Sequence, residues 1–157
     1  MGLMNSVLSW FRRAEREHRT ARSLLTDNYR GLAHLARQIK LHADHAPYPF
    51  VGERLRQMAS EKEKSLTTLG ECIERLGGRA TTVDPSLPSG RNHWERLSHD
   101  LDDQKQLEAQ MIDDSTHLAL DAPDSSDLLR QLTAVEKRHK EVLSDLLAKA
   151  DPQADQT

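Results

Sequence analysis

The sequence contains few of the residues that terminate helices or cross-link a fold. It has one cysteine, Cys72, with 6 prolines and 7 glycines among 157 residues. A single cysteine excludes an internal disulfide and is typical of a reducing compartment. The first residues lack the layout of a signal peptide, because Arg12 and Arg13 follow the short apolar stretch instead of preceding it. We therefore expect a cytoplasmic protein.

Aromatic residues and long apolar runs are also scarce. Aromatic residues make up 4% of the sequence, so aliphatic side chains must fill any core. No run approaches the roughly 20 apolar residues that span a bilayer, and we expect no membrane association. The net charge of −3 is spread in both signs along the chain, without a basic block. This pattern argues against nucleic acid as a partner.

Long stretches rich in Ala, Leu, Glu, Arg, Lys and Gln predict an all-helical domain over residues 1–150. Four helical patterns are separated by Pro47 with Pro49, by Gly77-Gly78, and by Pro123. Residues 1–17 either begin the first helix or form a separate helix that packs on the bundle or on another subunit. The polar residues 151–157 predict a disordered tail.

The lengths of the connections predict how the helices are arranged. Short turns join the first helix to the second and the third to the fourth, which favours two antiparallel hairpins. Residues 79–89 form a linker rich in Thr, Pro and Ser. At about 3.3 Å per residue, this linker is long enough to run most of the length of a helix. We expect an all-α four-helix bundle with a long crossover, which is the ferritin-like topology.

Polar residues interrupt the apolar stripe of every helix. Counting from the turns at about 1.5 Å per residue places several of them at a similar central height. We therefore predict one buried polar cluster. Its candidate members are Asn28, Lys62, Ser65, Glu108, Glu136 and His139, and Gln104 also falls on the apolar stripe of its helix.

Two of these helices resemble a known family. The second contains Met58-Ala59-Ser60-Glu61-Lys62-Glu63-Lys64-Ser65-Leu66 and ends in Leu76-Gly77-Gly78, and the fourth contains Ala134-Val135-Glu136-Lys137-Arg138-His139. Over residues 18–150 the chain resembles the rubrerythrin branch of the ferritin-like superfamily. The resemblance implies a di-metal site of four carboxylates and two histidines. Three of these ligand positions hold Glu108, Glu136 and His139, whereas the other three hold Asn28, Lys62 and Ser65.

The replacements change the charge of the implied site. A protonated lysine has no lone pair for a metal, and it repels a cation. Lys62 is instead suited to pair with Glu108 or Glu136, which are otherwise uncompensated charges in a core. We interpret Lys62 as an internal cation that takes the place of the metal, with His139 hydrogen-bonded nearby. Shifting the alignment to Glu61 does not restore the site, since Glu61 lies off the apolar stripe.

Simpler interpretations stay open for each of these residues. Glu136 and His139 can lie on a solvated helix edge, and Lys62 can extend its ammonium to water. His42 and His45 are either zinc ligands or partners of the helix dipole. A metal alternative uses Glu108, Glu136 and His139 to bind iron or manganese, with His18 or His34 as further ligands.

The function that we expect is non-enzymatic, without cofactor or catalytic residue. The chain is interpreted as a degenerate ferritin-like protein with a structural, stress-related or partner-binding role. Long apolar helices and Trp10-Phe11 favour a homodimer through helix packing. One alternative is a metal-dependent oxidoreductase or iron-handling protein. Another is a helical adaptor that shares only bundle architecture with ferritins.

Overall fold

The chain is all helical in the computed structural model, which describes residues 2–81 and 90–151. Four helices follow in order: α1 (Gly2–Asp44), α2 (Pro49–Arg75), α3 (His93–Leu118) and α4 (Pro123–Lys149). They pack together, and the described ranges contain no strand. The predictions of an all-α chain and of four packed helices are therefore confirmed.

The helix ends follow from local sequence. Pro49 and Pro123 stand in the first turns of α2 and α4, where a proline leaves no hydrogen bond unmade. Gly77 ends α2 with a φ of 82°, a backbone conformation that favours glycine. The amide of Gly78 then donates to the carbonyl oxygen of Ile73 at 3.0 Å, which closes the C-terminal turn.

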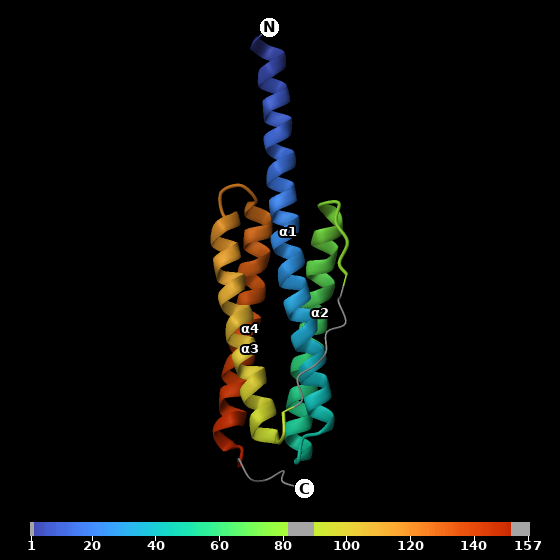
Figure 1. Ribbon diagram of the computed structural model, residues 1–157, viewed down its shortest axis with the longest axis vertical. Helices are drawn as coiled ribbons and strands as arrows, with labels where there is room; N and C mark the ends of the chain where they lie inside the picture. Colours follow the sequence, from blue (N-terminus) through green and yellow to red (C-terminus); the bar gives the residue numbers. More distant parts are fainter. Residues whose placement is uncertain (1, 82–89, 152–157) are drawn as a thin grey trace.

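The helices form two antiparallel pairs (Figure 1). α1 packs mainly on α2, and α3 packs mainly on α4, with further contacts between α1 and α3 and between α2 and α4. In Figure 1, α2 and α3 run in the same direction, so the end of α2 and the start of α3 lie at opposite ends of the bundle. Most of the expected linker, residues 82–89, lies outside the described residues.

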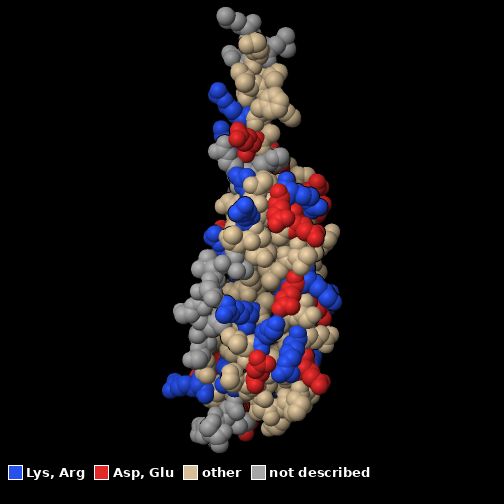
Figure 2. Space-filling model, turned by 90° about the vertical axis from the view of Figure 1, so that its right-hand side faces the viewer, with Lys and Arg blue, Asp and Glu red and all other residues tan. Residues whose placement is uncertain are grey.

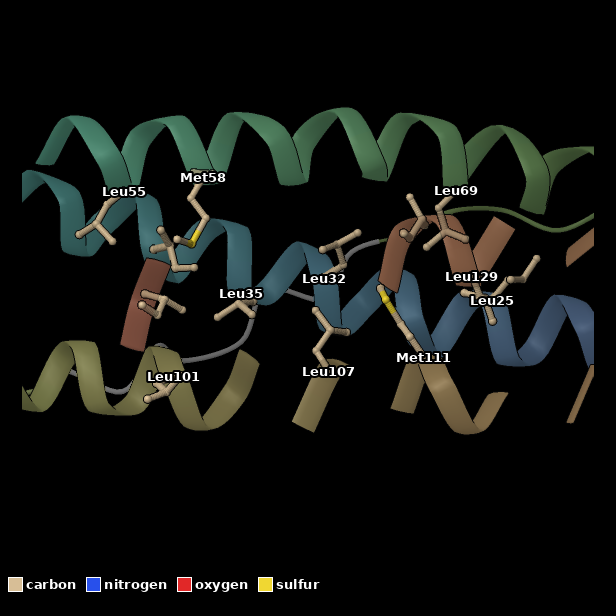
Figure 3. Packing of buried hydrophobic residues seen from close by; sticks show 14 of the residues in the cluster. Leu25, Leu32, Leu35, Leu55, Met58, Leu69, Leu101, Leu107, Met111 and Leu129 are labelled. Carbon is tan, nitrogen blue, oxygen red and sulfur yellow. The ribbon is translucent and has the colours of Figure 1, made fainter. Parts of the chain in front are cut away.

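Aliphatic side chains fill the core, as the shortage of aromatic residues predicts. Leucines from all four helices meet along the bundle axis, with Met58 and Met111 between them (Figure 3). Tyr29 is partly buried at the edge of this cluster. The hydrophobic core therefore extends along the bundle axis on both sides of the height at which the polar cluster was predicted.

The first helix is longer than the bundle that it joins. α1 runs without a break for 43 residues from Gly2, so residues 2–17 belong to this helix and are not a separate one. Between Gly2 and Gly31 the sequence has neither proline nor glycine to interrupt it. Its first turns project beyond the other helices (Figure 1). Except for Asp151, the predicted disordered tail falls outside the described residues.

No helix in the described part of the chain is both long and apolar enough to cross a membrane.

Candidate functional site

Lys62 lies at the centre of the bundle, and its side chain is 0% exposed. It occupies a core position of α2, three residues after Ala59 and seven after Leu55, both of which are buried. The Nζ atom donates to three acceptors, as an ammonium group can. These are Oε1 of Gln104 at 2.7 Å, Oε2 of Glu136, and Nδ1 of His139 at 3.1 Å. Lys62 therefore links α2 to both α3 and α4.

Gln104 is a second hydrogen-bond donor to the carboxylate on α4. Its Nε2 atom donates to Oε2 of Glu136 at 2.6 Å and to the backbone carbonyl of Glu136 at 3.0 Å. Its Oε1 atom accepts from Lys62, so both ends of the amide are used. One glutamine thus orients the carboxylate and the ammonium together.

The ring of His139 has a defined tautomer in this arrangement. An ammonium can only donate, so Nδ1 of His139 carries a lone pair toward Lys62. The ring proton then lies on Nε2, which donates to Oε2 of Glu61 at 2.7 Å. The Glu61 side chain is 38% exposed. A continuous set of hydrogen bonds therefore runs from the buried Lys62 to the surface of the bundle.

The charges of this set follow from burial and pairing. Burial by itself raises the pKa of Glu136, but the charge of Lys62 and the hydrogen bonds from Lys62 and Gln104 oppose it, and this pKa is lowered to about 2. Burial lowers the pKa of Lys62, and the charge of Glu136 opposes that shift. The hydrogen bond from His139 lowers the pKa of Glu61. This set of residues thus contains one buried carboxylate–ammonium pair, Glu136 with Lys62, and a second carboxylate, Glu61, at the surface.

The structure brings together only some of the residues predicted for the cluster. The predicted pairing of Lys62 with Glu136 and the nearby hydrogen bond of His139 are confirmed. The possible pairing of Lys62 with Glu108 is not observed. Instead, Glu108 contacts Lys140 of α4, with 2.8 Å between Oε2 and Nζ. Its position at the edge of the α3–α4 contact places it within reach of that more exposed lysine.

The other two predicted members also lie apart from Lys62. Asn28 donates to the carbonyl of Leu24 at 2.9 Å and to Oδ2 of Asp114 at 2.7 Å. Ser65 is buried, but in the described ranges no hydrogen bond joins it to the cluster. Similar height along the bundle was therefore not sufficient for contact, because the rotation of each helix also matters.

Glu61 is the member that sequence reasoning missed. It lies off the apolar stripe of α2, as expected, yet it contacts His139 because α4 packs along that side of α2. Its position next to Lys62 in the sequence was the available signal. Gln104 was expected at core register, but its two-sided contact with Lys62 and Glu136 was not anticipated.

A second polar layer lies between α1 and α3. Asp100 is fully buried, and both of its carboxylate oxygens lie 2.8 Å from Nδ1 of His42. Gln38 donates to Asp100 at 2.8 Å and to Asp103 at 3.0 Å. His45 is exposed, so the two histidines of this helix end do not converge on one site.

The donor groups do not fit a di-metal centre. A metal needs the lone pairs of Glu136 and His139, and the Lys62 ammonium binds both. Glu108 is bound to Lys140 rather than directed at this pair. Across residues 2–81 and 90–151, no three His, Cys, Asp or Glu side chains are grouped so as to hold a metal ion.

Comparison with known proteins does not identify the chain. No protein-family model matches the sequence, and no curated protein matches it.

Proposed function

We propose that this chain is a non-catalytic, ferritin-like helical bundle with a structural, stress-related or partner-binding role. The observation that carries the proposal is the buried Lys62, whose ammonium occupies the place between Glu136 and His139. In a metal-containing bundle, ions join the helices by binding carboxylates from several of them. Here a lysine joins α2, α3 and α4 through hydrogen bonds and one ion pair.

The arrangement of the helices supports the ferritin-like part of the proposal. The two antiparallel pairs, and the shared direction of α2 and α3, are consistent with a one-crossover bundle (Figure 1). Glu136 and His139 lie one turn apart on α4, with 3.6 Å between Oε1 and Nδ1. Such an i, i+3 pair is the ligand unit of carboxylate-bridged metal sites in helical bundles.

The burial of the polar groups supports a non-enzymatic role. Lys62, Gln104 and Glu136 have no exposed surface, and His139 is 3% exposed. A substrate has no access to the ammonium or to the buried carboxylate. The single cysteine is also buried and supports a reducing, cytoplasmic environment for the protein.

The alternative is a metal-binding oxidoreductase or iron-handling protein that uses Glu108, Glu136 and His139. The retained Glu136–His139 pair is the one observation that favours it. Metal binding then requires Lys62 to withdraw from both residues, which leaves its charge without these partners. The observed hydrogen bonds therefore favour the metal-free function.

Metal analysis of the purified full chain tests the proposal. Cells are grown with added iron, manganese and zinc, and the metal content of the protein is measured by mass spectrometry. We expect no stoichiometric transition metal. Stoichiometric iron or manganese that is lost in Glu136→Ala, and kept in the exposed control Glu63→Ala, would overturn the proposal. The control shows whether removing any one surface carboxylate is enough to lose the metal.

A further inference from the structure

The projecting part of α1 carries an unusual number of exposed apolar side chains. Trp10 and Phe11 are 64% and 58% exposed, and their rings meet edge to face with centroids 5.2 Å apart. Figure 2 shows the corresponding uncharged surface near the tip of the helix, above a band of charged side chains. The exposed apolar side chains of this segment are Met4, Val7, Leu8, Trp10 and Phe11. A contiguous apolar surface of this kind indicates an interface.

The exposed stripe continues the face by which α1 packs in the bundle. Val7, Ala14 and Ala21 are separated by seven residues each, so they lie on one side of the helix. Ala21 is fully buried within the bundle, whereas Val7 is exposed beyond it. The same periodicity that packs α1 against its neighbours thus extends past the end of those neighbours. The projecting segment is therefore suited to pack against another helix.

A recess lies beside this segment. Its volume is about 330 Å³, and it is lined by Trp10, Arg13, Ala14 and Glu17 of α1 and by Leu120 and Asp121 of the turn between α3 and α4. Leu120 is 94% exposed. The small side chain of Ala14 leaves room between the larger ones. The recess thus has room for an inserted side chain, between the apolar surfaces of Trp10 and Leu120 and the charged side chains of Arg13, Glu17 and Asp121.

We propose that the projecting segments of two copies of this chain pack side by side and antiparallel, and so form a homodimer. Trp10 of each copy then lies opposite Phe11 of the other. Val7 lies opposite Ala14, a large side chain against a small one. Met4 lies opposite Glu17, at the level of the recess beside Leu120. The inference rests on the partner-binding part of the proposed function and supplies its surface.

The charges of the projecting segment favour a second copy of this chain as the partner, and they favour antiparallel over parallel packing. Residues 2–11 contain no charged side chain, whereas residues 12–22 contain five arginines and two glutamates. Antiparallel packing centred on Trp10 places the uncharged half of one copy against the charged half of the other. Parallel packing would instead place Arg13 and Arg16 beside their own copies, where like charges repel. Arg13 is already paired with Glu17 in its own chain, at 2.9 Å.

Disulfide trapping tests the register in the full chain. Val7→Cys and Ala14→Cys proteins are mixed and oxidised, with Cys72 unchanged because it is buried. We expect the mixed dimer as the main product, identified by intact mass, and little product from Val7→Cys alone. In the proposed register, the two copies of position 7 are offset by about 10 Å along the axis, too far for a disulfide. Efficient linkage of Val7→Cys to itself would overturn the antiparallel register.

Sedimentation equilibrium tests the surface itself. Phe11→Glu is expected to raise the dimer dissociation constant at least about tenfold, because the buried ring is replaced by a charge in both copies. Ser9→Glu is the matched control, since it lies about 160° around the helix from Phe11. A wild-type chain that stays monomeric, or a dimer that Phe11→Glu leaves unchanged, would contradict the proposal.

A lipid surface is the competing occupant, because an apolar helix with nearby arginines also suits an anionic membrane. Co-sedimentation with vesicles of phosphatidylcholine and phosphatidylglycerol separates the two. We expect no binding to these vesicles. A monomer that binds them through Phe11 would overturn the dimer. Either failure leaves the Lys62 contacts and the metal analysis unaffected, so it is distinguishable from failure of the proposed function.

Discussion

The imidazole of His139 accepts a hydrogen bond from the ammonium of Lys62, with 3.1 Å between Nδ1 and Nζ. This hydrogen bond determines which ring nitrogen of His139 carries the proton. Because Nδ1 faces a donor, only Nε2 is left to carry the ring proton toward Glu61. The hydrogen bonds therefore run in one direction, from the buried ammonium of Lys62 through the imidazole of His139 to the carboxylate of Glu61 at the surface.

The first prediction concerns this tautomer. At pH 8 we expect His139 to be the Nε2–H form, because the other form would place a proton between Nδ1 and the ammonium. Long-range proton–nitrogen correlation spectra of the imidazole rings measure the tautomer directly. Exposed His45 provides the control ring in the same sample. A predominantly Nδ1–H spectrum for His139 would contradict the hydrogen bonds from Lys62.

The second prediction concerns pH. The pKa of Glu136 falls from 4.5 to about 2 in the folded chain. A carboxyl group with a lowered pKa stabilises the fold above its unfolded pKa, and this contribution is lost as the pH falls from about 4.5 toward 2. The shift corresponds to about 3 kcal/mol. Urea unfolding at several pH values should show this loss, and Glu136→Gln should flatten that part of the curve.

The third prediction separates a buried lysine from one that reaches water. Lys62→Met leaves Glu136 without its cation, and the free energy of unfolding should fall by about 3 kcal/mol. Lys64→Met on the exposed face of the same helix is the matched control and should have little effect. The double variant Lys62→Met/Glu136→Leu should recover most of the loss, because it removes both charges. Equal stability of Lys62→Met and the control would mean that the ammonium reaches solvent.

The fourth prediction concerns Gln104. Gln104→Leu removes an acceptor from Lys62 and two donors from Glu136, so it should cost about 1–3 kcal/mol of unfolding free energy. Gln106→Leu, at an exposed position of the same helix, is the control. Chemical denaturation measures both. A loss that persists in the Lys62→Met/Glu136→Leu background would mean that Gln104 acts through packing or through its bond to the backbone carbonyl of residue 136, and not through its contacts with the two charged side chains.

The helices were predictable from sequence because proline and glycine residues near their ends determine where they begin and stop. Pro49, Gly77 and Pro123 punctuate the chain at the observed boundaries. The Lys62–Glu136 pair was predictable for a different reason. Both residues stand at the centre of an apolar stripe, where a charge needs a partner of opposite sign.

Contacts at the edges of the stripes were not predictable in the same way. The apolar period places a side chain on a helix face, but it does not give the rotation of the neighbouring helix. Glu108 therefore contacts Lys140, and Asn28 contacts Asp114, instead of joining the central cluster. His42 is paired with Asp100 of another helix for the same reason.

The last prediction tests whether Lys62 stands at a former ligand position. The triple variant Asn28→Glu/Lys62→Glu/Ser65→His adds two carboxylates and an imidazole, and it removes the ammonium that binds Glu136 and His139. If these positions correspond to ferritin-like ligands, the variant should bind iron or manganese with defined stoichiometry. Lys62→Glu alone should bind no metal and should be less stable, because it places two carboxylates together in the core. Metal titration followed by mass spectrometry measures the outcome. A folded triple variant without metal would show that the resemblance does not extend to the ligand positions, whereas binding lost again in Glu136→Ala would identify Glu136 as a ligand.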